Sequence, residues 1–153
     1  MAYCKTEDVK SMLKDDVINS IIGENRLLDE LEKERLLTPI LVGAVSDATA
    51  EIEGYLNKRY PIPLFAVPPM IEKLAKDIAV YNIMSRSGID AGERESNYLT
   101  RYNAAIKYLT MAAEGKVDIG LETKVPSGNG KSNSTFYFTN NEAIFSRKKM
   151  QGM

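Results

Sequence analysis

The sequence has no histidine among its 153 residues, no tryptophan and a single cysteine. Without histidine, the commonest general base and metal ligand are missing, and the usual catalytic triads are excluded. The single cysteine, Cys4, excludes a disulfide within the chain, and its surroundings are typical of a small apolar packing residue. These absences argue against an enzyme, and we expect no cofactor, no metal and no small-molecule substrate.

Long apolar runs are missing as well, since no stretch reaches the roughly 18 residues of a membrane span. The start of the chain lacks the pattern of a signal peptide, so we expect a protein that stays in a cytoplasm and has no membrane partner. The net charge of -1 gives no bulk attraction to nucleic acid. The charge is uneven, however, because residues 122–153 carry five Lys or Arg against two Glu.

What the sequence does contain is helical periodicity in a composition of 44% hydrophobic and 27% charged residues, which is ordinary for a globular domain. The spacing predicts helices over 4–13, 15–23, 38–59, 69–88 and 97–115, while 24–37 is either helix or loop. Thr38 is expected to cap the third helix, with Pro39 in its first position. We therefore predict an all-α fold: a small helical bundle over 1–121, then a flexible loop and a short β or extended C-terminal arm over 122–153.

The stretch RYPIPLFAVPP, residues 59–69, holds four of the six prolines of the chain. The apolar residues between the prolines do not suit a solvated linker. A stiff connector with Arg59, Pro61 and Pro63 as structural residues predicts two helices held at a fixed angle. In this interpretation Leu64 and Phe65 seal the core.

Asp77 interrupts the helix predicted over 69–88 at the beginning of its second half, which is apolar nearly all round. A carboxylate on such a surface needs a partner. We predict that a cation holds Asp77, and Arg59 is the candidate. A catalytic role for Asp77 is the weaker alternative, because the sequence supplies no second acid or base for it.

One face of the helix predicted over 38–59 carries small residues, among them Gly43, Ala50 and Gly54. Two glycines cost about 1 kcal/mol each in a helix interior relative to alanine. Two interpretations stand: a plain solvent face, or a face that another helix approaches closely and that binds a partner.

The C-terminal arm carries apolar and basic residues beyond a polar loop. The loop motif SGNGKS fails the phosphate-loop pattern, because Val125 stands where that pattern needs its first glycine. We predict that the arm binds a partner through Phe136, Phe138 and Phe145, with Arg147, Lys148 and Lys149 near acidic protein surface or DNA phosphate. The alternative is a tail folded back on its own bundle.

Four stretches together resemble a known family: SDATAEIEGYLNKRYPIPL, VPPMIEKLAKDIAVYNI, EGKVDIGL and the ending FSRKKMQGM. They are similar to the joining proteins of Mu-type phages and prophages. The resemblance implies a non-enzymatic head–tail connector, similar to the head-completion adaptors of long-tailed phages. Such a subunit forms a homo-oligomeric ring, contacts portal and tail-side virion proteins, and touches phage DNA in passing. It is made in the bacterial host cytoplasm and ends in the virion. The competing hypothesis is a small helical regulatory or nucleic-acid-associated binding module.

Overall fold

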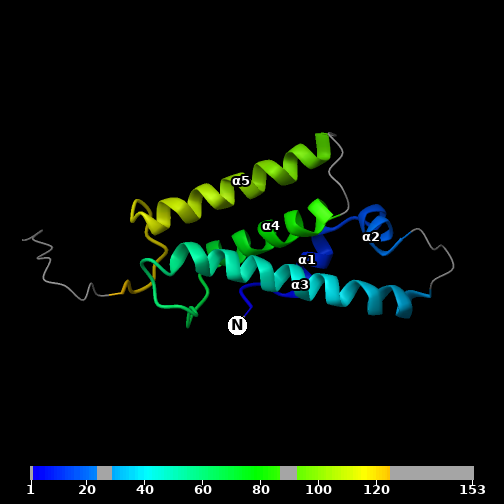
Figure 1. Ribbon diagram of the computed structural model, residues 1–153, viewed down its shortest axis with the longest axis horizontal. Coiled ribbons are helices and arrows are strands. Elements are labelled where there is room, and N and C mark those ends of the chain that lie inside the picture. Colours follow the sequence, from blue (N-terminus) through cyan, green and yellow to red (C-terminus); the bar gives the residue numbers. More distant parts are fainter. Residues whose placement is uncertain (1, 24–28, 87–92, 125–153) are drawn as a thin grey trace, which may run out of the picture.

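The computed structural model describes residues 2–23, 29–86 and 93–124, which form five helices (Figure 1). In chain order these are α1 (Thr6–Met12), α2 (Asp15–Ile22), α3 (Glu30–Leu56), α4 (Pro69–Arg86) and α5 (Glu93–Ala113). The long helices α3, α4 and α5 pack against one another, α1 lies against α3 and α4, and α2 contacts α3. The described residues contain no strand, and the all-α prediction is confirmed.

Helix α3 begins eight residues before the predicted cap at Thr38, and this prediction was wrong. The helix starts instead behind Asp29, whose side chain accepts a hydrogen bond from the Glu30 N–H at 2.8 Å. Thr38 lies inside the helix and donates its hydroxyl to the Glu34 carbonyl at 2.7 Å. Pro39 is therefore an interior residue, although it removes one donor from the helical hydrogen bonds.

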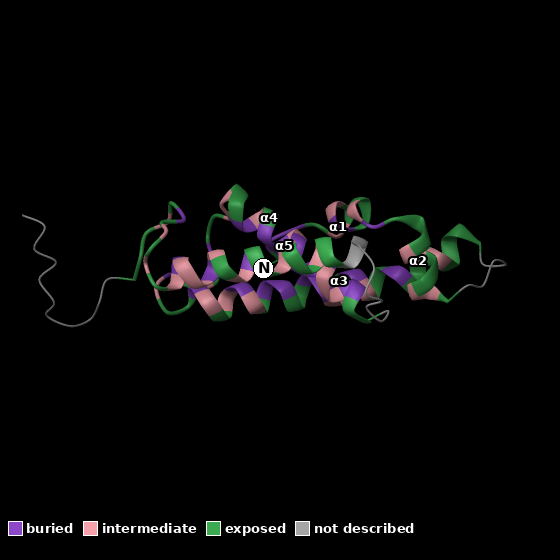
Figure 2. Cartoon of the chain, turned by 90° about the horizontal axis from the view of Figure 1, so that it is seen from above, coloured by how far each residue is buried: buried purple, intermediate pink, exposed green. Residues whose placement is uncertain are grey.

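The core is built on the apolar stripe of α3 and on nearly every side of α4. Figure 2 shows how buried residues recur along α3 and gather on α4. The start of α4 at Pro69 and its central position agree with the sequence prediction. On α5 the residues that face this core are Ala105, Leu109 and Ala112, all fully buried.

The segment before α1 is part of the core, which the sequence did not indicate. Tyr3 is 2% exposed, and its hydroxyl donates to Glu53 of α3 at 2.8 Å. The same hydroxyl accepts the Leu64 N–H at 3.1 Å, and the Tyr3 N–H donates to Thr49 at 3.3 Å. One tyrosine thus joins the N-terminal segment, α3 and the proline-rich connector. Burial, only partly offset by the Leu64 N–H, raises the pKa of Tyr3 to about 12, with Glu53 adding to the rise.

Replacing Tyr3 by phenylalanine should lower the free energy of unfolding by about 1–2 kcal/mol, because the buried Leu64 N–H loses its acceptor. The substitution should also change the response to alkali. The folded pKa of about 12 exceeds the ordinary 10.0, so the unfolded chain loses this proton first and stability falls as the pH rises through that window. Urea titrations between pH 9 and 11.5 should show a smaller fall for Tyr3→Phe than for the wild type. Equal slopes would contradict the assignment.

The residues of the connector between α3 and α4 divide into buried and exposed ones, while its role in fixing the angle between the two helices stays a prediction. Tyr60 and Leu64 are buried, whereas Pro61 and Pro63 are exposed and the Ile62–Pro63 bond is cis. Phe65 is 94% exposed. The prediction that Phe65 seals the core was therefore wrong.

The loop and arm predicted beyond residue 124 lie outside the described residues, and so do the anchors proposed there: Phe136, Phe138, Phe145, Arg147, Lys148 and Lys149. The described chain reaches Lys124, whose contacts still belong to the bundle. None of the helices in the described ranges is both long and apolar enough to cross a membrane.

Candidate interaction surface

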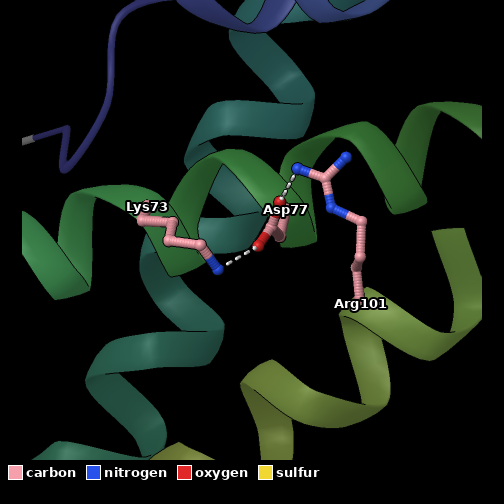
Figure 3. Close-up of polar contacts among 3 residues, drawn as sticks. All are labelled: Lys73, Asp77 and Arg101. Carbon is pink, nitrogen blue, oxygen red and sulfur yellow. Dashed lines mark hydrogen bonds and ion pairs between the residues drawn. The ribbon is translucent and has the colours of Figure 1, made fainter.

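Asp77 is held by two cations, as Figure 3 shows. Its side chain is 2% exposed on α4. Lys73, one turn earlier on the same helix, approaches one carboxylate oxygen at 3.2 Å. Arg101 of α5 donates to the other oxygen. The prediction that a cation holds Asp77 is confirmed, and the cluster ties α4 to α5.

The prediction that Arg59 is the cation that pairs with Asp77 was wrong. Arg59 lies instead where the connector meets the end of α5, with its guanidinium 5.9 Å from the centre of the Tyr60 ring. A β-carbon built on Gly115 would stand 1.7 Å from Arg59 Nη1, so the two residues are in close contact. Among the described residues, no acceptor reaches the buried Arg59 Nε or the buried Tyr60 hydroxyl.

Gly115 ends α5, as the sequence predicted, because its φ of +78° belongs to the left-handed region. Its N–H donates to the Ala112 carbonyl at 3.1 Å, and the Lys116 N–H donates to the Met111 carbonyl at 2.9 Å. This is the Schellman arrangement of a helix end. Lys124 completes the junction, since its N–H donates to the Arg59 carbonyl and its ammonium to Asn57, both at 2.7 Å.

Two tyrosines on neighbouring helices pack their rings against each other within the bundle. Tyr81 of α4 and Tyr102 of α5 stack with centroids 4.2 Å apart and planes 20° apart. Tyr102 also donates its hydroxyl to Glu51 of α3 at 2.8 Å. Burial, followed by the Glu51 contact, raises the pKa of Tyr102 to about 12. One face of each ring is therefore already covered by the other ring. This favours a packing role for the pair over the alternative, in which exposed tyrosine rings stack on the bases of a nucleic acid.

The small-residue face of α3 is open. A β-carbon at Gly43 or Gly54 would meet nothing within 4 Å, and Ala50 is exposed. No described helix of the same chain packs there, so close approach by a helix of another molecule stays a prediction. Ala50 also borders a groove of about 590 Å³ between the N-terminal segment and α3. The groove is lined by Ala2, Cys4, Lys5, Thr6, Glu7, Val42, Val45, Ser46, Thr49, Ala50 and Glu53.

The acidic residues do not form a metal centre within the described ranges, where no group of three or more His, Cys, Asp or Glu side chains is placed to hold an ion. Cys4 is buried, and burial raises the pKa of its thiol to about 11, which makes the thiolate scarce at neutral pH. The described surface also exposes apolar side chains, among them Phe65 and Leu31, and it has an open groove on α3 with a partly apolar lining.

The fold and surface thus define a small all-α bundle with apolar side chains exposed at several places. The chain belongs to the bacteriophage Mu Gp36 family, whose model matches residues 3–135. It is 31% identical to the Mu-like prophage FluMu protein gp36 of Haemophilus influenzae over 90 residues, which cover 57% of this chain and 60% of that protein. It is 24% identical to gene product J of Escherichia phage Mu over 106 residues, 69% of this chain and 70% of that protein. This is a protein of a Mu-type phage family, as the sequence motifs indicated.

Two of those sequence stretches lie against each other in the structure. RYP, residues 59–61, and EGKVDIGL, residues 114–121, meet where Arg59 packs against Gly115. The groove and the exposed Phe65 were not predicted from the sequence. In the sequence Leu64 and Phe65 are two adjacent apolar residues, and nothing local shows that only Leu64 is buried.

Proposed function

We propose that this protein is a structural head–tail connector subunit of a phage or prophage virion. It joins the portal side of the head to the tail through a homo-oligomeric ring, and it acts without catalysis. The observation that carries the proposal is the match to the Mu Gp36 family over residues 3–135. The contacts of Asp77 and Arg59 support it, because they fix the angles between helices. A ring closes only if each subunit keeps its shape, whereas a contact that misses closure makes a filament.

The partners follow from the same proposal. The open face with Gly43, Ala50 and Gly54 receives a helix of a neighbouring virion protein. The arm beyond Lys124 reaches a portal or tail-side protein, and its basic end lies near acidic protein surface or phage DNA. The subunit is made in the bacterial cytoplasm and is then built into the virion.

The proposal predicts that the protein is present in many copies in purified virions and that particles lacking it accumulate as separate heads and tails. Quantitative mass spectrometry and negative-stain microscopy of an induced lysogen, with and without the gene, measure both. A chain that ends after Lys124 keeps the contacts to Asn57 and Arg59, so it should melt like the full chain yet fail to join heads to tails.

Absence from mature particles, with normal joining in the deletion strain, would refute the connector role. In that case the competing role as a regulatory or nucleic-acid-associated module would be tested by DNA binding. The logarithm of the DNA-binding constant should then fall linearly with the logarithm of the salt concentration.

A further inference from the structure

Phe65 is the most exposed large apolar side chain of the described residues, at 94%, and Leu31 follows at 71%. The residue before it is fixed: Leu64 is 2% exposed, and its N–H donates to the Tyr3 hydroxyl at 3.1 Å. The ring therefore projects from an anchored base. Aromatic residues presented in this way are typical anchors of protein–protein interfaces, because little conformational entropy is lost when they are buried.

The groove on α3 has the size and lining to receive such a ring. Its volume of about 590 Å³ falls within the ~300–1,000 Å³ of ordinary binding pockets, so a phenyl ring and its neighbours fit together. Its apolar lining comes from Val42, Val45 and Ala50 of α3 and from Cys4. Val42 is 53% exposed, so part of this lining faces solvent in the single chain.

The connector end that carries Phe65 and the groove on α3 have complementary charges. The connector end, residues 57–68, contains no acidic residue and one exposed cation, Lys58, since the guanidinium of Arg59 is packed against Gly115. The groove lining contains Glu7 and Glu53 against a single cation, Lys5. Opposite charge across an interface favours the correct pairing and its register.

We infer that Phe65 of one copy inserts into the α3 groove of a second copy of this chain. The exposure of Phe65 shows that it does not fill the groove of its own chain. Each subunit then contributes a ring on one side and a groove on another, which makes the contact heterologous. Heterologous contacts produce closed rings when the rotation between subunits is right. The inference rests on the proposed function, because it names the contact between neighbouring subunits of that connector.

The first test is the association of purified full-length protein, measured by sedimentation velocity over a range of concentrations. Phe65→Ala should weaken association at least about tenfold, the effect of losing a central aromatic anchor. Leu31→Ala, at the other strongly exposed apolar position, is the matched control and should leave association unchanged. Both variants should melt like the wild type, since neither side chain is buried.

The second test places the ring in the groove by cross-linking, in a Cys4→Ala background without native thiols. A mixture of Phe65→Cys and Ala50→Cys proteins should form a mixed disulfide dimer under mild oxidation. Phe65→Cys mixed with Leu99→Cys, an exposed position on α5, should form far less. Equal yields in both mixtures would overturn the assignment of the groove.

The two proposals fail in different ways. If Phe65→Ala associates like the wild type and is built into infectious particles, the self-contact is wrong and the connector role stands. If the wild type is abundant in virions but shows no concentration-dependent association, the self-contact is again wrong. If the protein is absent from virions yet gives the specific 50–65 cross-link, the connector role is wrong and the self-contact stands.

Discussion

Replacing Arg101 by methionine should lower the free energy of unfolding by about 2 kcal/mol. The substitution removes the α5 cation from Asp77, whose side chain is 2% exposed. Breaking a fully buried pair costs about 3–5 kcal/mol and breaking an exposed one under about 1 kcal/mol. The intermediate value is expected because Arg101 is 40% exposed and because Lys73 remains beside the carboxylate.

The free energy of unfolding should fall by less when the carboxylate of Asp77 is removed than when Arg101 is removed. Asp77→Asn leaves Arg101 and Lys73 able to reach water, since they are 40% and 61% exposed. Added to Arg101→Met, it should restore part of the lost stability, because no unpaired buried charge is left. Urea unfolding of the two single variants and the double variant measures this. Lys107→Met is the control: Lys107 is an exposed cation of α5 without an ion pair to any described residue, and its loss should cost under about 0.5 kcal/mol. Additive losses in the double variant would contradict the predicted coupling.

Much of the helical architecture follows from local signals in the sequence. Pro69 begins α4 and Gly115 ends α5, because a fixed φ suits a first turn and a left-handed φ suits a helix end. The start of α3 shows the limit of such signals. Thr38 and Pro39 have the pattern of a helix start, yet the helix runs through both from Glu30. The helical turns formed by residues 30–37 stabilise the helix by more than the hydrogen-bond donor missing at Pro39 destabilises it.

The contacts between helices were less predictable than the helices. The need of Asp77 for a cation follows from its apolar surroundings, but its partner depends on which residues of α5 face α4. Arg101 precedes the buried Ala105 by four residues, so it lies on the inward side of α5, and that spacing was the available signal. Arg59, nearer in sequence, lies instead at the end of α5 beside Gly115.

Replacing Gly115 by alanine should lower the free energy of unfolding by about 2–3 kcal/mol, the largest effect expected of any substitution proposed for this chain. Two costs add. An alanine at a φ of +78° costs about 1–2 kcal/mol. The new β-carbon would also stand 1.7 Å from Arg59 Nη1 and 2.9 Å from its Cζ, so the guanidinium must leave its site. This shift should cost about 1 kcal/mol, the low end of the cost of overpacking, because the atoms that must move are the end of a flexible side chain.

Gly120 separates these two costs, because it has nearly the same φ, +77°, and a β-carbon there would meet nothing within 4 Å. Gly120→Ala should therefore cost only the about 1–2 kcal/mol of the backbone conformation. In an Arg59→Ala background the guanidinium is gone, and Gly115→Ala should then cost no more than Gly120→Ala. Thermal and urea unfolding of these variants complete the double-mutant cycle. If Gly115→Ala remains as costly without Arg59, the contact between the RYP and EGKVDIGL motifs does not explain why glycine is required at this position.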